Sequence, residues 1–376
     1  MTTVGVVGGG QLAQMLHQAA IGLGVRVVVL DPDPRCSAAL AGAERLDGTW
    51  TSLEDLQRFA RSGVDVVTFD HELTAPEDVA TLDAESPVPV RPSAATLLLA
   101  QDKLVAREAL GEQGLPVPAF AAVATLDDVV AFGERHGWPL VLKARRGGYD
   151  GRGVWFASTP EEAAAVLAET DGGGVELLAE ERVDIDHELA VMVARRPAGE
   201  VRAWPPLRTT QVDGICTEVV LGPSSALEDE ARGLTVDLAQ RVALTGVMAV
   251  ELFATRDGRL VVNELACRPH NSGHVTMDSC RTGQFEQHLR AVLDLPLGDP
   301  APNVAAAAMI NVLGGPDPWD AAGLAAALEV DGATLHLYGK GHRPGRKLGH
   351  VNAVGGSAAD ALAAARRAAE ALGSPV

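Results

Sequence analysis

The chain is poor in basic residues, and it contains no long uninterrupted apolar run. Lysine and arginine number 31 against 50 aspartates and glutamates, which gives a formal net charge of −19 over 376 residues. A nucleic-acid-binding surface needs an excess of cations, so we expect no nucleic acid among the partners. No apolar segment reaches the length of a membrane span, and the N-terminus lacks the basic stretch of a secretory signal. We therefore expect a cytoplasmic protein with no membrane partner.

Cysteine is also scarce, with only four in the chain, and no two of them have C-x-x-C spacing. The pattern indicates neither a zinc site nor a disulfide framework, and we interpret the cysteines as free thiols in a reducing compartment. Apolar residues make up 47% and charged residues 22% of the sequence, as in ordinary globular proteins. A chain of this length has room for two or three domains.

Residues 1–92 alternate between strand-like and helix-like patterns, which predicts a parallel sheet with crossover helices. The predicted strands are Val4–Val7, Val25–Leu30 and Val64–Phe69, and the predicted helices are Gln11–Leu23 and Ser52–Arg61. The segment should therefore form an N-terminal Rossmann-like domain.

The turn Gly8-Gly9-Gly10-Gln11-Leu12-Ala13 fits the G-x-G-x-x-G/A pattern, and Asp31 follows at the place of a ribose-binding acid. A nicotinamide- or flavin-dependent oxidoreductase is therefore one hypothesis. The glycines alone show only that the backbone approaches something at a helix N-terminus, where a monophosphate would be equally favoured. After the third predicted strand, Asp70-His71-Glu72 lies at the sheet edge where ligands usually bind.

Three prolines between residues 87 and 92 mark a boundary, after which Ser93 is a plausible helix N-cap and Gln101–Glu112 a predicted helix carrying Lys103. Further on, Lys143 ends an apolar strand-like run. The following segment, residues 147–153, contains four glycines. Free backbone N–H groups flanked by Lys143 and Arg152 favour a loop that closes over phosphates.

Two apolar runs joined by Asp257-Gly258 predict a β-hairpin, and each run carries one carboxylate, Glu251 and Glu264. Buried acids on adjacent strands repel each other unless a cation lies between them. Oxygen ligands of this kind suit Mg²⁺ held beside a nucleotide. Arg268, His270 and Asn271 follow directly, as a dense set of donors for a small anion.

These features together resemble the ATP-grasp superfamily, and within it the 5-(carboxyamino)imidazole ribonucleotide synthase family of purine biosynthesis. The resemblance runs from Gly8 to His350. Its most specific segments are Gly147–Gly153, Asn263–Ala266, His270–His274 and Arg343–Lys347. It implies an α/β fold with a Rossmann-like domain at 1–92, an ATP-grasp domain at 93–300 that includes a small α/β lid at about 116–178, and a C-terminal α/β domain at 301–376.

The resemblance also implies a set of ligands and residue roles. The expected ligands are ATP with Mg²⁺, bicarbonate and 5-aminoimidazole ribonucleotide, and a homodimer is expected. ATP would contact Lys103, Lys143, Tyr149, Gly151, Gly153, Glu180, Glu181, Val183, Glu188 and Asn263, with Mg²⁺ on Glu251 and Glu264. The ribonucleotide would contact Gln11, Leu12, Glu72, Tyr149, Asp150, Arg152, Lys340 and Arg346. Bicarbonate and the catalytic step would involve Arg268, His270, Asn271 and Lys340.

The segment Lys340–Lys347 contains four Lys or Arg in eight residues of an otherwise acidic chain. Short-range pairing with two or three donors can hold a single phosphate despite distant acids. We expect Lys340 and Arg346 to bind the ribonucleotide together with the Gly8–Gly10 turn.

Two residues depart from the family pattern. Cys267 stands where proline is usual, and Asp70 stands where glutamate is common. We expect the first to loosen the turn before Arg268, and the second leaves open which of Asp70 and Glu72 contacts the substrate. A formate-using purine formyltransferase of the same superfamily is a further alternative.

Overall fold

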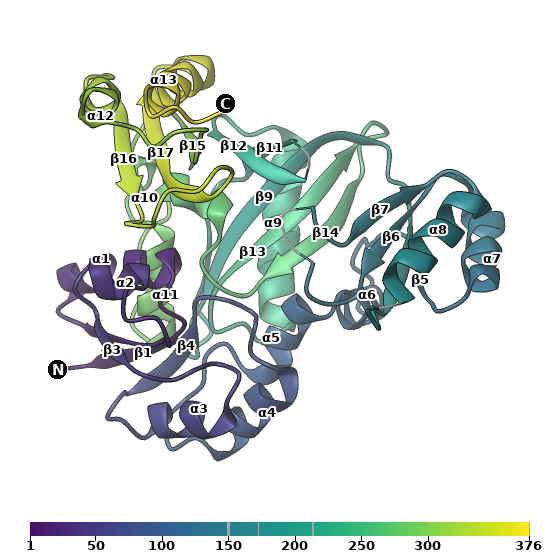
Figure 1. Ribbon diagram of the computed structural model, residues 1–376, viewed down its shortest axis with the longest axis horizontal. Helices are drawn as coiled ribbons and strands as arrows, with labels where there is room; N and C mark the ends of the chain where they lie inside the picture. Colours follow the sequence, from purple (N-terminus) through teal and green to yellow (C-terminus); the bar gives the residue numbers. More distant parts are fainter. Residues whose placement is uncertain (149–150, 172, 213, 376) are drawn as a thin grey trace.

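The computed structural model describes residues 1–148, 151–171, 173–212 and 214–375, which form three β-sheets with helices packed against them (Figure 1). Tyr149 and Asp150, both predicted to bind ligands, lie outside the described residues. Within these ranges, none of the helices has the length and apolar character needed to cross a membrane.

The first sheet has the order β3-β2-β1-β4 and is entirely parallel, as the alternating pattern predicts. Its strands are β1 (Thr3–Val7), β2 (Arg26–Leu30), β3 (Glu44–Leu46) and β4 (Val66–Phe69), and its helices are α1 (Gln11–Leu23), α2 (Ser37–Leu40), α3 (Leu53–Ala60) and α4 (Pro76–Glu85). The edge strand β3 was not predicted, because three residues are too few to show a period. Helix α1 has the predicted bounds.

The predicted start of the helix Gln101–Glu112 is wrong, because the helical conformation is interrupted at Asp102. Helix α5 (Ala94–Gln101) ends there and α6 (Lys103–Glu112) begins at the next residue. Asp102 has an extended backbone, with φ −129° and ψ 106°, and its carboxylate accepts the N–H groups of Leu104 and Val105. An aspartate in this position caps the second helix. Lys103 is therefore the first residue of a helix and not part of a continuous one.

The second sheet is antiparallel, with the order β5-β8-β6-β7, and projects to the right of the molecule in Figure 1. Its elements are β5 (Phe120–Val123), α7 (Leu126–His136), β6 (Leu140–Ala144), β7 (Val154–Ala157), α8 (Pro160–Asp171) and β8 (Leu177–Glu181). The glycine-rich segment joins β6 to β7, so it connects strand to strand as predicted. We call this unit, residues 120–181, the lid.

The third sheet has nine strands and the order β14-β13-β9-β11-β12-β15-β17-β16, with β10 beside β9. Its strands are β9 (Ile185–Arg195), β10 (Val201–Ala203), β11 (Leu207–Val212), β12 (Ile215–Leu221), β13 (Gly246–Thr255), β14 (Leu260–Ala266), β15 (Ala306–Leu313), β16 (Ala333–Leu337) and β17 (Lys347–Gly355). The remaining helices are α9 (Ala226–Arg241), η1 (Asn271–Val275), α10 (Thr276–Ser279), α11 (Gln284–Val292), α12 (Ala321–Leu328) and α13 (Ala358–Ala371). Because β12 pairs with β15, the C-terminal strands extend the central sheet.

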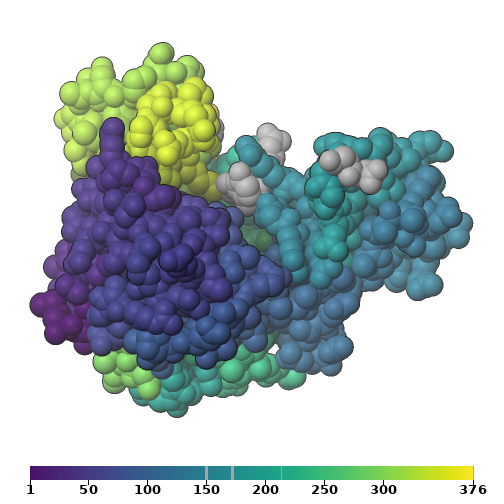
Figure 2. Space-filling view, turned by 60° about the horizontal axis from the view of Figure 1, so that its bottom comes forward, coloured from purple at the N-terminus to yellow at the C-terminus, as the bar shows by residue number. Residues whose placement is uncertain are grey.

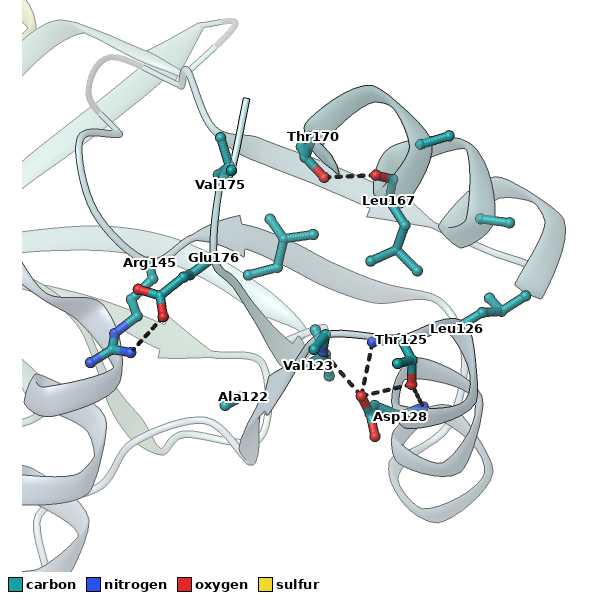
Figure 3. A pocket seen from close by; sticks show the side chains of 15 residues that line it. Ala122, Val123, Thr125, Leu126, Asp128, Arg145, Leu167, Thr170, Val175 and Glu176 are labelled. Carbon is teal, nitrogen blue, oxygen red and sulfur yellow. Dashed lines mark hydrogen bonds and ion pairs between the residues drawn. The ribbon is translucent and has the colours of Figure 1, made fainter. Parts of the chain in front are cut away.

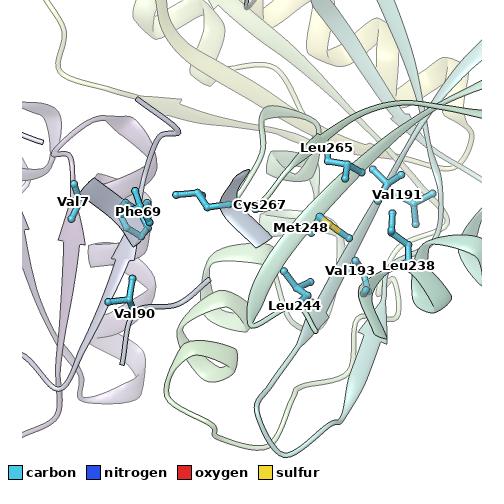
Figure 4. Close-up of a cluster of buried hydrophobic side chains, with 14 of the residues drawn as sticks. Val7, Phe69, Val90, Val191, Val193, Leu238, Leu244, Met248, Leu265 and Cys267 are labelled. Carbon is cyan, nitrogen blue, oxygen red and sulfur yellow. The ribbon is translucent and has the colours of Figure 1, made fainter. Parts of the chain in front are cut away.

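One buried apolar cluster connects the first sheet with the third. Figure 4 shows Val7 and Phe69 on one side, Met248 and Leu265 on the other, and Cys267 between them. Cys267 is fully buried, and its thiol donates to the Thr96 carbonyl over 3.3 Å. A buried cysteine behaves as a small apolar residue, so in this chain packing and one hydrogen bond hold the segment before Arg268.

The N-terminal sheet with its helices lies against the C-terminal part of the chain, whereas the lid stands apart from both (Figure 2). Tyr338, in the segment between β16 and β17, is buried in one apolar cluster with Leu12 of α1 and Phe285 of α11. This packing brings the basic C-terminal segment against the first helix of the chain. The basic segment therefore lies beside the turn that follows β1.

Candidate active site

All three amides of the glycine turn after β1 are hydrogen-bonded within the protein. Gly8 donates to the Leu30 carbonyl over 2.9 Å, Gly9 to the Asp31 carboxylate over 2.8 Å and Gly10 to the Asp70 carboxylate over 2.7 Å. Gly8 has φ +97°, and a Cβ on it would lie 1.8 Å from an Asp70 oxygen. Because glycine has no Cβ, the side chains of Asp31 and Asp70 can pack against this turn. In a dinucleotide-binding fold these donors face a pyrophosphate.

This arrangement removes the structural basis of the oxidoreductase hypothesis. Asp31 accepts the amides of Gly9 and Asp33, so it does not stand free for a ribose. The expectation that the Gly8–Gly10 turn also binds the substrate phosphate stays a prediction, although its three amides are already hydrogen-bonded and two carboxylates lie against it.

A cavity of about 330 Å³ lies next to this turn. It is lined by Gly9, Gly10, Gln11, Leu12, Asp31, Trp50, Asp70, His71 and Arg268. The predicted substrate residues Gln11 and Leu12 thus share one cavity with the predicted anion ligand Arg268. Trp50 was not predicted as a site residue, and His71 was considered only as part of the segment after β4. Their rings meet edge-on at 4.6 Å between centroids, and nothing in the local sequence around Trp50 indicated this contact.

Asp70 and Glu72, the two acids between which the sequence leaves the substrate contact open, have different partners in the protein. Asp70 caps the Gly10 amide, and burial raises the pKa of its carboxyl to about 7, although the Gly10 amide and the Arg268 guanidinium act in the opposite direction. Glu72 accepts a 2.6 Å hydrogen bond from Arg268 Nε, while its other oxygen, Oε1, is buried and receives no donor from the described residues. Glu72 is therefore the acid with a free acceptor.

The anion donors predicted after β14 are held by Gln284, which was not predicted. Its side chain accepts the His270 N–H and donates to the His270 carbonyl, each over 2.8 Å. Burial, with Arg268 and Lys347 nearby, lowers the pKa of His270 to about 3, so its ring is neutral. The Asn271 amide nitrogen is buried, and its side chain interacts with the Cys216 thiol, a weak acceptor. A buried amide with so weak a partner can still donate to an anionic ligand.

The predicted hairpin is present, and it places Glu251 of β13 directly opposite Glu264 of β14. Burial, and to a smaller extent the charges of Glu264 and Glu188, raise the pKa of Glu251 to about 8. Lys103 Nζ contacts Glu264 at 2.6 Å, and His270 Nε2 lies 3.8 Å from Glu251. The acid pair therefore adjoins the anion donors.

The acid pair fits a divalent cation. In the part of the chain that the structure describes, no three His, Cys, Asp or Glu side chains are placed so that they could hold a metal ion together. Two carboxylates are nevertheless a usual protein contribution to a Mg²⁺ site that nucleotide phosphates and water complete. The charge of Glu264 adds to the effect of burial in raising the pKa of Glu251, and a cation between the two carboxylates would relieve this repulsion.

Glu180 does not present a free carboxylate. It is almost fully buried and bonds Lys143 Nζ and Arg107 Nε, both at 2.7 Å. Lys143 also donates to the Asn263 side chain over 3.1 Å, and Arg107 donates to the Asn263 carbonyl. Three of the predicted ATP residues thus form one network with Arg107, which was not predicted. Its position one helical turn after Lys103 is the signal that could have indicated it.

The other predicted ATP residues lie around this network. Glu181 accepts the Ala119 amide at 2.9 Å, Val183 is half-buried, and burial raises the pKa of Glu188 on β9. Gly151 and Gly153 have φ near +75°, a backbone conformation that favours glycine. Lys143 is buried at the end of β6, immediately before the glycine-rich segment.

The basic C-terminal segment reaches the substrate cavity through Lys340, whose Nζ donates to the Gln11 side chain over 2.6 Å. Burial lowers the pKa of Lys340 to about 8, and the nearby charge of Arg346 acts in the same direction. Arg346 is half-buried and donates to the Gly341 carbonyl over 3.0 Å. Two cations drawn together in this way favour an anion between them.

A larger cavity, of about 690 Å³, lies in the lid between α7 and α8 (Figure 3). It contains none of the predicted site residues. Its lining consists mostly of alanine, valine and leucine side chains, with Arg145 and Glu176 at one end. The convergence of charged groups distinguishes the smaller cavity as the candidate active site.

Three family models match consecutive parts of the chain. They are the ribonucleotide synthetase preATP-grasp domain at residues 1–101, the ATP-grasp domain at 108–285 and the phosphoribosylaminoimidazole carboxylase C-terminal domain at 307–364. The first match covers the parallel sheet, the second covers the lid and most of the central sheet, and the third begins in β15.

Similar proteins cover nearly the whole chain. An N5-carboxyaminoimidazole ribonucleotide synthase of Mycobacterium tuberculosis is 46% identical over 97% of this chain and 86% of its own length. The crystal structure of the corresponding synthetase of Thermus thermophilus is 35% identical and superimposes with a TM-score of 0.88 over 99% of both chains. A synthase of Aspergillus clavatus, solved with ADP and 5-aminoimidazole ribonucleotide, is 30% identical with a TM-score of 0.88 over 99% of this chain and 98% of its own.

Proposed function

Because the chain belongs to the N5-carboxyaminoimidazole ribonucleotide synthase family of ATP-grasp ligases, we propose that it carboxylates the exocyclic amine of 5-aminoimidazole ribonucleotide. ATP and bicarbonate are the other substrates, and ADP and phosphate are released. The observation that carries this proposal is the 3.8 Å separation between His270 and Glu251, which puts the anion donors next to the acid pair. A small acid bound there lies beside the phosphates of a nucleotide held at the acid pair.

Bicarbonate is a poor electrophile, so it needs activation before an amine can attack it. In the proposed first step, a bicarbonate oxygen attacks the γ-phosphorus of ATP, the bond to ADP breaks, and carboxyphosphate forms. The exocyclic amine then attacks the carboxyl carbon, either directly or after release of CO₂. Phosphate leaves and the amine loses a proton. Exclusion of water by the lid would preserve the short-lived intermediate.

Glu251 and Glu264 are the residues that would hold Mg²⁺, which supplies charge neutralisation on the transferring phosphoryl group. Lys143 and Lys103 add positive charge on the lid side and the core side of the acid pair. Lys103 contacts Glu264 at 2.6 Å, so it is already placed beside the phosphates that this carboxylate would approach.

His270 can act on bicarbonate as a neutral hydrogen-bond donor. Its Nδ1 accepts from the Ser272 amide, which leaves the ring proton on Nε2, the atom that faces Glu251. Arg268 contributes a fixed positive charge, and the Asn271 amide, which interacts with the weakly accepting Cys216 thiol, supplies another donor. These three groups can orient the bicarbonate oxygens for attack on the γ-phosphorus.

The test of the function is ADP formation with bicarbonate or formate, each with and without 5-aminoimidazole ribonucleotide. We expect sustained turnover only with bicarbonate and the ribonucleotide together, and a carboxylated product. Turnover that requires formate would instead assign the formyltransferase activity. We also propose a cytoplasmic homodimer, from the family resemblance, and light scattering of the purified protein tests the dimer.

We predict that Arg346→Ala weakens ribonucleotide binding by about 1.5–3 kcal/mol, the range for a hydrogen bond to a charged group. The KM for ATP should change little, because Arg346 lies in the C-terminal segment that reaches Gln11 and not at the acid pair. Initial rates with each substrate varied in turn provide the measurement.

The control for Arg346→Ala is Arg343→Ala, which removes an exposed cation from the same segment. This variant should leave both KM values near those of the wild type. A rise in the KM for ATP with an unchanged KM for the ribonucleotide would assign the segment to the other substrate.

A further inference from the structure

The glycine-rich segment of the lid is anchored at its root by one carboxylate of the core. Asp102 is fully buried between α5 and α6. It accepts hydrogen bonds from Arg145 Nε at 2.8 Å and Arg146 Nε at 2.9 Å, the two residues that follow β6. The same carboxylate accepts the amides of Leu104 and Val105. It therefore joins the first turn of α6 to the start of the glycine-rich segment.

The backbone reinforces this connection. The Lys103 amide donates to the Arg145 carbonyl over 3.0 Å, and the Arg145 amide donates to the Glu176 carbonyl over 2.9 Å. Farther along the segment, a Cβ on Gly148 would lie 3.9 Å from Lys103 Cε. The root of the segment and the first residue of α6 are thus held next to each other at both the backbone and the side-chain level.

Lys103 links this connection to the acid pair, since its Nζ contacts Glu264 at 2.6 Å. Asp102 thus holds the root of the glycine-rich segment, which belongs to the lid, beside Lys103, which belongs to the core. Charge-assisted hydrogen bonds in a buried setting are strong and directional. A group that fixes two such elements relative to each other sets the geometry of the site between them.

We propose that Asp102 is a positioning residue for the ATP-dependent reaction: through Arg145 and Arg146 it sets the position of residues 145–148, the root of the glycine-rich segment, relative to Lys103. This inference rests on the proposed function, because it assumes that the segment closes over ATP. Asp102 itself touches no reacting group. The other pairing of Arg145 is with Glu176, at 3.4 Å (Figure 3). Loss of the Asp102 carboxylate would leave that exposed acid as the remaining ionic partner of Arg145 among the described residues.

The test compares Asp102→Asn with two variants that remove the partners, Arg145→Gln and Arg146→Gln. Asparagine can still cap α6, so the first variant mainly weakens the bonds to the arginines. A displacement of about 1 Å at a site can reduce the rate on the order of 100-fold. We expect kcat/KM for ATP to fall about 10-fold to 100-fold in Asp102→Asn, with little change in the KM for the ribonucleotide.

The arginine variants make the test specific, because they leave the helix cap intact. Arg145→Gln should reproduce most of the loss, and the double variant Asp102→Asn/Arg145→Gln should be no worse than Asp102→Asn alone. Coupled residues are non-additive in this way. Full additivity, or normal ATP kinetics in Arg145→Gln, would overturn the proposal. Arg146→Gln removes a partner that is half exposed and should fold even if Asp102→Asn does not.

A matched control is Glu228→Gln. Glu228 is also a buried acid that caps a helix and pairs with an arginine, since it accepts the Ser225 amide at the start of α9 and Arg208 Nε over 2.7 Å. Helix α9 packs on Leu189 and Val191, which face the opposite side of the sheet from Glu251. Glu228→Gln should lower thermal stability without changing ATP kinetics. An equal fall in kcat/KM in this variant would show that stability alone explains the effect.

Hydrogen exchange separates failure of this inference from failure of the proposed function. Amides of residues 103–105 and 145–148 should exchange faster in Asp102→Asn than in the wild type, whether or not a substrate is present. If the wild-type protein lacks the proposed activity but this difference is observed, the role of Asp102 in holding residues 145–148 is supported and the proposed function is refuted. Unchanged exchange in Asp102→Asn would refute the anchor directly.

Discussion

Glu264→Gln is expected to remove nearly all ATP-dependent activity while leaving the fold intact. An amide is a poor ligand for Mg²⁺, and it would leave the charge on the transferring phosphoryl group uncompensated. A loss of more than about 2 kcal/mol of transition-state stabilisation is reasonable for a group in this role. The Glu264 side chain on β14 is 43% exposed, so little packing is lost.

The measurement is turnover over a range of Mg²⁺ concentrations, together with circular dichroism to verify folding. Asp257→Asn is the control, because Asp257 is an exposed acid in the turn of the same hairpin and pairs only locally with Arg259 and Thr255. It should retain wild-type activity. Near-normal turnover of Glu264→Gln at saturating Mg²⁺ would remove Glu264 from the metal site.

Glu180→Gln is expected to destabilise the protein more than any other single change discussed above. The substitution would leave Lys143 and Arg107 facing each other in a buried site without the acid between them. Breaking a buried ion pair by removing one partner costs about 3–5 kcal/mol of unfolding free energy. Urea unfolding monitored by fluorescence gives the difference. Glu181→Gln, at the next and more exposed position, should lose no more than about 1 kcal/mol.

The pH dependence of this effect has a definite sign. Burial raises the pKa of Glu180, but Lys143 and Arg107 outweigh it and hold the pKa below its ordinary value of 4.5. A carboxyl whose pKa is depressed in the folded state stabilises the protein fully above its ordinary pKa and loses this contribution as the pH falls through the folded value. The difference between wild type and Glu180→Gln should therefore persist at neutral pH and shrink in acid. A difference that grows on acidification would contradict the pairing.

Sequence alone determined the features that depend on local pattern. Helix α1 has the predicted bounds because its apolar residues recur on one face and a glycine ends it. The hairpin that carries Glu251 and Glu264 follows from two apolar runs joined by Asp-Gly. The parallel order of the first sheet follows from the alternation of strands and helices. The motifs that resemble the family are short and contiguous, so they too can be recognised without a structure.

Only the tertiary structure decided which partner each polar group finds. The turn amides of Gly9 and Gly10 could equally have faced a phosphate, but the carboxylates of Asp31 and Asp70 occupy them. Glu180 could have faced a nucleotide, but Arg107 and Lys143 hold it. In each case the competing partners lie 22 to 73 residues apart or belong to a ligand. Hydrogen-bond pairing depends on distances of about 3 Å, and the sequence pattern carries no information on such distances between remote residues.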